Sequence, residues 1–96
     1  MATQLILTPE QLDQLEEMGA ALLAPSDIAI ILGFDADQRR LFTEMCISHE
    51  RCDAYARYQK GKMTTKYELR RTVVRLAKAG SPAAGPIADK YLNELE

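Results

Sequence analysis

The chain has 96 residues and a mass of 10.7 kDa, which allows one modest hydrophobic core and leaves no room for a two-domain catalytic cleft. Hydrophobic residues make up 47% and charged residues 27%, so the composition is that of a globular chain and excludes disorder throughout. The net charge of −2 argues, at face value, against a nucleic-acid partner.

The N-terminal part of the chain carries the signals of a first helix. Thr8 is a suitable N-cap, Pro9 suits the first helical position, and the acidic Glu10 lies in the first turn. We expect the helix to end at Ala24, because a residue that precedes a proline, here Pro25, is disfavoured from helical conformation. Apolar residues at spacings of three and four give this helix one apolar face, formed by Leu12, Leu15, Met18 and Leu22.

The next segment predicts a short apolar helix through Leu32. Ser26 or Asp27 can cap it, and Gly33 suits its C-terminal end. The apolar run of residues 28–32 would also suit a buried strand, but the chain offers no convincing second strand to pair with it. We therefore expect a helix.

A third helix is expected to begin at Asp35 or Asp37. After it, the chain either bends near Ser48 and His49 or continues directly into the next helix. The inward-facing residues of the third helix are expected to be Leu41, Phe42, Met45 and Cys46.

From about Cys52 to Ala79 the pattern stays helical. Gly61 is the weak point of this long helix, with a cost of about 1 kcal/mol relative to alanine, and the sequence leaves open whether the helix is continuous there. Ser81 and Pro82, a cap followed by proline, open a last helix. The long helix carries an apolar stripe that consists of Leu69, Val73, Leu76 and Ala77.

The net charge conceals a strong asymmetry along the chain. Residues 1–38 carry −7 and contain no Lys or Arg, residues 39–80 carry +7, and residues 81–96 carry −2. Such an asymmetry points either to a nucleic-acid footprint or to an electrostatically complementary contact between copies. A third interpretation is that the charged residues lie on solvated helix faces that differ in net charge and bind no partner.

Residues 25–42 resemble a helix-turn-helix motif: a short helix with a small residue, Ala29, then the turn glycine Gly33, then a second helix. The motif usually places an apolar residue six positions after its glycine, where this chain has Arg39, so the turn is longer or the following helix is rotated. A plain helical hairpin is the alternative. On the helix-turn-helix interpretation, the third helix contacts DNA through Gln38, Arg39, Arg40 and Thr43.

A second group of cations is interleaved with tyrosines on the long helix. Lys and Arg side chains there would hold DNA phosphates with salt-sensitive affinity. Two other interpretations are a solvated face with half-buried tyrosines, and a face that meets the acidic residues 10–37 of a neighbouring subunit. The cations that we expect to contact DNA are Arg57, Lys60, Lys62, Lys66 and Arg70, with Arg71 beside them.

Cys46, His49 and Cys52 follow one another at intervals of three, so zinc binding has to be weighed. Ligands six residues apart on one helix converge poorly, and no fourth ligand follows. A catalytic Cys46–His49 pair would lack an orienting third group, and the carboxylates show no pairing for acid–base chemistry. We expect no catalytic residue, no metal, no cofactor and no enzymatic activity.

The first seven residues contain no basic residue and no cleavage site of a signal peptide. The longest apolar run, residues 28–33, is far shorter than the roughly 20 residues of a membrane span. Two cysteines without a secretory signal fit a reducing compartment. We expect a cytoplasmic protein with no membrane partner.

Several short segments follow one another in a recognisable order: Ile28-Ala29…Leu32-Gly33, Ala54-Tyr55…Gly61-Lys62, Glu68-Leu69-Arg70-Arg71, and Leu76 to Ala84 with its Gly80-Ser81-Pro82 junction. Over about residues 10–93 this order resembles the small terminase subunits of tailed bacteriophages and prophages. The resemblance implies a homeodomain-like helix-turn-helix over residues 8–48 that recognises viral DNA. It implies, over residues 50–96, a long basic helix and a C-terminal helix that form an oligomerisation region within one compact unit.

The same resemblance implies a homo-oligomer in the cytoplasm of a bacterial host, with double-stranded DNA and a large terminase subunit as partners and no catalytic site of its own. Leu69, Val73 and Leu76 would then support the oligomer contacts.

The sequence thus predicts an all-α fold, with a helix-turn-helix bundle followed by a long helix and a short C-terminal helix. Its leading functional prediction is a non-catalytic DNA-binding protein of phage packaging, with the third helix in the major groove and the basic helix on phosphates. One alternative is a helical oligomeric adaptor or scaffold with no nucleic-acid role. Another is a phage or prophage transcriptional regulator.

Overall fold

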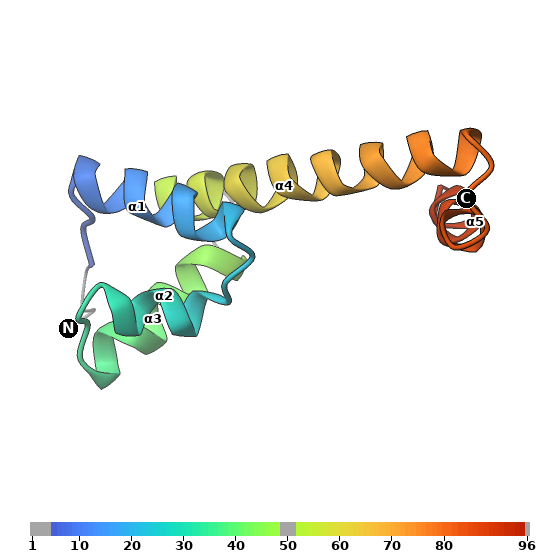
Figure 1. Ribbon diagram of the computed structural model, residues 1–96. Coiled ribbons are helices and arrows are strands. Elements are labelled where there is room, and N and C mark those ends of the chain that lie inside the picture. The colour runs from blue at the N-terminus through green and yellow to red at the C-terminus, as the bar shows by residue number, and fades with distance from the viewer. Residues whose placement is uncertain (1–4, 49–51, 96) are drawn as a thin grey trace. The chain divides into compact units, whose positions relative to one another are not determined.

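A computed structural model describes residues 5–48 and 52–95 of the chain (Figure 1). This described part contains helices and no strand, which confirms the predicted all-α class. None of these helices is long and apolar enough to span a bilayer. The helices are α1 (Pro9–Ala20), α2 (Pro25–Ile31), α3 (Ala36–Ser48), α4 (Asp53–Lys78) and α5 (Ala84–Asn93).

The chain divides into two compact units, with the boundary inside α4. Unit 1 comprises Met1–Thr65 and contains α1, α2, α3 and the first half of α4. Unit 2 comprises Lys66–Glu96 and contains the second half of α4 together with α5.

The start of α1 is fixed by a reciprocal capping box. The Gln11 backbone N–H donates to the Thr8 hydroxyl at 3.1 Å, and the Thr8 backbone N–H donates to the Gln11 side-chain oxygen at 2.9 Å. Pro9 occupies the first helical position, where its missing N–H costs nothing. The predicted cap and first residue of this helix are confirmed.

The predicted end of α1 at Ala24 is wrong, because the helix stops at Ala20 in a Schellman turn. The N–H of Leu23 donates to the carbonyl of Met18 at 3.2 Å, and Leu22 adopts a left-handed conformation with φ of 65°. Leu22 therefore leaves the apolar face on which the sequence placed it and is 53% exposed. The sequence gives no signal for this turn, since glycine is its usual residue.

The start of α2 also differs from the prediction. Pro25 is its first residue and Ala24 stands at the N-cap without a side-chain hydrogen bond, so the predicted caps Ser26 and Asp27 lie inside the first turn. The predicted stop at Gly33 is confirmed, with φ of 81° and the same Schellman pattern.

The core of unit 1 lies where α2 and α3 pack together and meet α1 and α4 (Figure 1). The rings of Phe34 and Phe42 contact at 5.3 Å between centroids. Fully burying one large apolar side chain contributes about 1.5–3 kcal/mol, so this cluster is the main source of stability in the unit. Its buried members are Leu15, Ile28, Ala29, Phe42, Cys46, Ala54 and Tyr58.

Two glycines let α1 and α4 approach closely. A Cβ atom on Gly61 would lie 2.0 Å from the carbonyl oxygen of Glu16, and one on Gly19 would lie 3.0 Å from the carbonyl oxygen of Tyr58. The Thr65 hydroxyl donates to the carbonyl of Ala20 at 2.5 Å one turn further along. The helix is continuous through Gly61, which is a close-packing position of the crossing and not merely a weak point of the helix.

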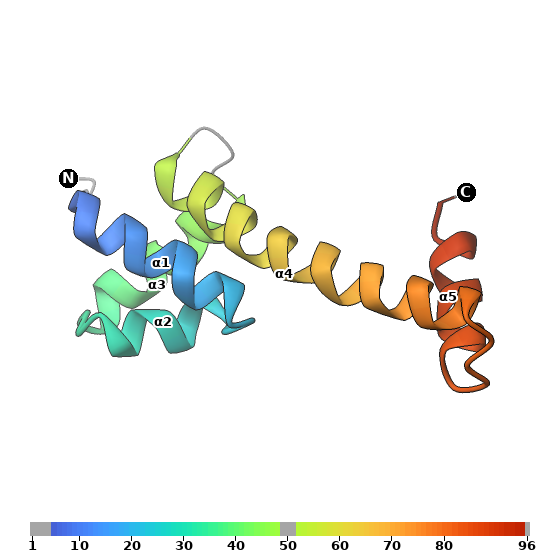
Figure 2. The same ribbon diagram turned by 45° about the horizontal axis from the view of Figure 1, so that its top comes forward.

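In unit 2, α4 ends and the chain turns back so that α5 packs against its last turns (Figure 2). Gly80, with φ of 92°, forms the C-terminal turn of α4 as expected. The hydroxyl of Ser81 accepts from the N–H of Ala84 at 3.4 Å, and α5 begins at Ala84, two residues after the expected Pro82. Among the described residues of unit 2, only Ala84 is buried.

Candidate functional site

The start of α3 uses one of its predicted DNA-contacting side chains internally. The backbone N–H of Asp35 donates to the Gln38 side-chain oxygen at 3.0 Å, and the N–H of Gln38 donates to the Asp35 carboxylate at 2.8 Å. This capping box confirms Asp35 as the cap of α3. It also ties the Gln38 side-chain oxygen to the protein backbone, so a two-point contact with a base edge through both the oxygen and the NH2 group would break the box.

The other predicted residues of α3 differ in their surroundings. Arg40 lies 3.9 Å from the carboxylate of Asp37, with both side chains largely exposed. Arg39 is exposed and forms no ion pair with a described residue, while Thr43 is half-buried in the middle of the helix. The acidic Asp35 and Asp37 beside these arginines lower the attraction of this helix end for phosphate.

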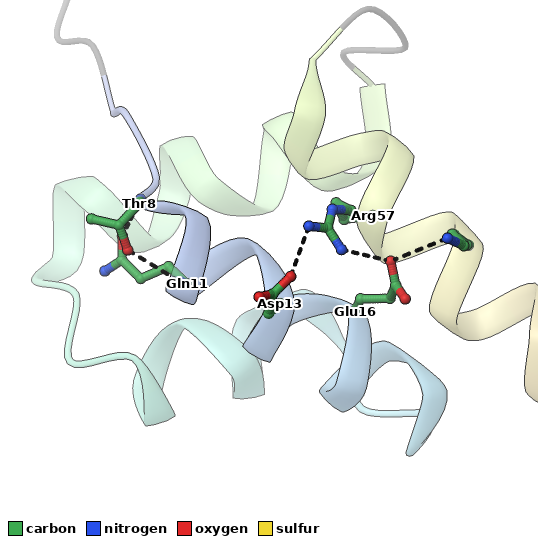
Figure 3. A network of polar contacts seen from close by, with 6 residues as sticks. Thr8, Gln11, Asp13, Glu16 and Arg57 are labelled. Atoms are coloured by element: carbon green, nitrogen blue, oxygen red, sulfur yellow. Dashed lines mark hydrogen bonds and ion pairs between the residues drawn. The ribbon is translucent and has the colours of Figure 1, made fainter.

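Arg57, which is half-buried, connects α4 to α1 (Figure 3). Its guanidinium donates to the carboxylate of Glu16 at 2.9 Å and to that of Asp13 at 2.8 Å. Both hydrogen bonds raise the pKa of Arg57, and the one to Glu16 has the larger effect. Lys60 lies 3.9 Å from the same Glu16 carboxylate. Acidic side chains of α1 thus partly neutralise the charges of Arg57 and Lys60, the two residues predicted to contact DNA in this part of α4.

Lys62 and Arg70 each lie over an aromatic ring of their own unit. The Lys62 ammonium is 5.4 Å from the ring centroid of Tyr58. The Arg70 guanidinium is 4.1 Å from that of Tyr91 and donates to the Glu94 carboxylate at 2.6 Å. The hydrogen bond and charge of Arg70 lower the pKa of Glu94. Arg70 therefore holds α5 against α4, whereas Lys66 is exposed.

A groove of about 850 Å³ lies between α4 and α5 within unit 2. Arg71, Arg75 and Lys78 line it, are exposed, and form no ion pair with a described residue. We call this feature the unit 2 groove. Its apolar and aromatic lining includes Tyr67, Val74, Ala77, Tyr91, Leu92 and Leu95.

The sequence prediction includes Arg71 among the basic residues and Ala77 in the apolar stripe, but it does not combine them into one site. The signal that marks it is the spacing of four, three and four residues in the series Tyr67, Arg71, Val74 and Lys78, which places the four side chains on one side of the helix. The predicted apolar stripe consists instead of Leu69, Val73, Leu76 and Ala77, of which only Ala77 lines the groove.

The predicted oligomerisation residues lie on another side of α4. Leu69 is 54% exposed, Leu76 is 45% exposed, and Val73 is half-buried. Their exposure leaves them accessible to a partner, so their predicted role in an oligomer stays a prediction.

Unit 1 also exposes apolar residues, on the outer side of α2. Ile30 and Ile31 are 60% and 62% exposed, while Pro25, Ile28 and Ala29 of the same helix are buried. We call the side of α2 that carries Ile30 and Ile31 the outer α2 face.

The cysteines differ in environment. Cys46 is fully buried, and this burial, with a smaller effect of Cys52, raises the pKa of its thiol to about 12. Cys52 is half-buried, and His49, the third residue of the zinc hypothesis, lies outside the described residues. Within residues 5–48 and 52–95, no three His, Cys, Asp or Glu side chains gather as metal ligands would. A buried, protonated thiol is a poor nucleophile.

Compared with models of protein families, with curated proteins and with solved structures, the chain matches none of them.

Proposed function

We propose that the protein is a non-catalytic helical adaptor that associates with further copies of itself through the unit 2 groove. The observation that carries this proposal is the exposed apolar lining of the groove, with Leu92 at 62%, Leu95 at 80% and Tyr67 at 64% exposure. Contiguous exposed apolar surface is characteristic of interaction sites. Burying such a side chain on association contributes at most about 1.5–3 kcal/mol, before the entropic cost of association is subtracted.

The small number of buried residues in the described part of unit 2 supports the same proposal. Two short helical segments that bury only Ala84, among their described residues, gain little from packing against each other. Helix stability in proteins comes mainly from packing of apolar faces, so a partner that covers the groove would supply what this unit lacks.

Sedimentation velocity over a range of protein and salt concentrations tests this function. We expect a concentration-dependent oligomer that Leu92→Asp abolishes. Leu76→Asp, which places the same charge on the predicted stripe outside the groove, is the matched control and should assemble like the wild type. A wild-type protein that is monomeric at every concentration contradicts the proposal, and so does loss of assembly in Leu76→Asp alone.

DNA binding is the second candidate, and the lining cations favour it. Arg71, Arg75 and Lys78 are exposed and lack acidic partners among the described residues, as do Arg39 and Lys66. Cations on an exposed helix face suit phosphate contacts, which give affinity without sequence specificity. Recognition of bases by α3 and a role in packaging with a large terminase subunit remain predictions from the sequence.

Fluorescence anisotropy with a labelled duplex at several salt concentrations tests DNA binding. For the variant Arg71→Ala/Arg75→Ala/Lys78→Ala, we expect the slope of log affinity against log salt to become shallower by about 3, since each phosphate contact contributes about 0.9. Arg39→Ala/Arg40→Ala is the comparison variant for α3. No binding at low salt would exclude this function, and an effect only in the α3 variant would move the contact to that helix.

A further inference from the structure

The unit 2 groove combines two properties that together restrict its occupant. Its floor is apolar, and Arg71, Arg75 and Lys78 line it without acidic partners among the described residues. An occupant must therefore offer apolar side chains flanked by carboxylates, because burying apolar surface beside unpaired cations would otherwise leave their charge uncompensated.

The outer α2 face has this complementary chemistry. Ile30 and Ile31 are exposed there, and Asp27, which is also exposed, lies one turn before Ile31 on the same side of the helix. Asp35 follows just beyond the turn that ends α2 and is exposed as well. No Lys or Arg occurs in residues 1–38, and the nearest cations along the chain are Arg39 and Arg40 at the start of α3.

We infer that the unit 2 groove of one copy receives the outer α2 face of a second copy. This inference rests on the self-association proposed above and specifies which two surfaces contact each other. Leu92 and Leu95 of one copy contact Ile30 and Ile31 of the next, and the lining cations face Asp27. Contact between two grooves is disfavoured, because it would set the lining cations of both copies against each other.

The contact is head-to-tail, because it joins two different surfaces. Each copy that gives its α2 face to one neighbour keeps its own groove for another, so assembly continues until a ring closes or a filament forms. A contact between identical surfaces would instead stop at the dimer.

Complementary variants test this geometry. Ile31→Lys places a charge on the outer α2 face and leaves the unit 2 groove unchanged. Leu92→Asp places a charge in the groove and leaves the outer α2 face unchanged. Both substitutions lie at exposed positions, so both variants should keep the wild-type helical circular dichroism spectrum. By sedimentation velocity, we expect each variant alone to be a monomer of 10.7 kDa. An equimolar mixture should form a one-to-one dimer and nothing larger.

The outcomes separate this inference from the function on which it rests. If the wild type assembles and Ile31→Lys assembles equally well, or if the mixture of variants stays monomeric, the head-to-tail contact is excluded while self-association stands. If the wild type itself is monomeric, the proposed function fails as well. Leu69→Asp, an exposed position outside the groove, is the charge control and should assemble like the wild type.

Discussion

The two units of this chain are built in different ways. Unit 1 has an interior to which α1, α2, α3 and α4 all contribute, and α1 and α4 cross so closely that Gly61 leaves no room for a methyl group. Unit 2 buries only Ala84 among its described residues and holds α5 through contacts of Arg70. The first unit is specified by its own packing, whereas the second presents apolar surface that a partner can cover.

The charges follow the same division. In unit 1, Arg57 is used within the fold, where it pairs with Asp13 and Glu16. In unit 2, Arg71 and Arg75 form no ion pair with a described residue and line a groove. Cations that resemble one another in the sequence therefore differ in what they are available to bind.

The largest expected effect on stability distinguishes the core of unit 1 from the exposed packing of unit 2. Phe42→Ala should lower the free energy of unfolding by about 3–5 kcal/mol, because Phe42 is fully buried and its loss leaves a cavity in the core of unit 1. Leu92→Ala, at a position 62% exposed, should change it by less than about 0.5 kcal/mol at protein concentrations too low for assembly. Urea unfolding followed by circular dichroism measures both. Equal losses would show that unit 2 has an interior of its own.

The second-largest effect on stability is expected at the crossing of α1 and α4. Gly61→Ala should destabilise unit 1 by about 1–3 kcal/mol, since the new Cβ meets the backbone of Glu16, which cannot rotate away. Gly85→Ala in α5 is the matched control. Apart from its chain neighbours and its own helix backbone, no atom lies within 4 Å of its Cβ position. Alanine there should change the stability by less than about 1 kcal/mol, because its helix preference is opposed by the restriction that Pro86 places on the preceding residue. Urea midpoints compare the two, and an unchanged midpoint in Gly61→Ala would mean that α1 and α4 are not tightly packed in solution.

Features that depend on neighbouring residues could be predicted from the sequence. The cap at Thr8, the first helical residue Pro9 and the stops at Gly33 and Gly80 each follow from local backbone chemistry. The role of Gly61 could not be predicted, because it depends on the passage of α1 against α4. Local pattern gives helix types and ends, and tertiary contact decides which positions must be small.

The candidate site shows the same limit. The sequence identified α4 as basic, but the pairing of Arg57 depends on residues more than 40 positions away in the chain. The helix-turn-helix interpretation places Gln38 on DNA, although its spacing from Asp35 also fits the capping box that the structure contains. Charge counting therefore located the basic helix without separating cations used within the fold from those that line the groove.

A smaller effect concerns the turns that end the helices. Leu22 adopts the left-handed conformation that Gly33 and Gly80 adopt in the equivalent turns, and a side chain there costs about 1 kcal/mol. Leu22→Gly should therefore raise the stability of unit 1 by about 1 kcal/mol, whereas Gly33→Ala should lower it by a similar amount. Thermal unfolding checks both signs. A destabilised Leu22→Gly variant would show that the Leu22 side chain contributes packing that outweighs the strain.

The smallest effect tests the polar contact between Arg70 and Glu94 in unit 2. Because Arg70 lowers the pKa of Glu94, the pair favours the packed form of α4 and α5 at neutral pH. This contribution should be lost as the pH falls below the ordinary glutamate range of about 4.3 and passes through the lowered pKa. Titration of the Glu94 carboxyl carbon by NMR should give a midpoint below that range, and Arg70→Gln should restore it.

An ordinary midpoint in the wild type would mean that the Arg70–Glu94 contact does not persist in solution. Exposed ion pairs contribute little to stability, so such a loss would leave unit 1 unchanged. It would remove one polar contact between α5 and α4, and the packing of α5 would then rest on the Arg70–Tyr91 contact and on the apolar residues between the two helices. The pH at which Glu94 titrates thus reports whether the Arg70–Glu94 contact beside the groove is formed before a partner binds.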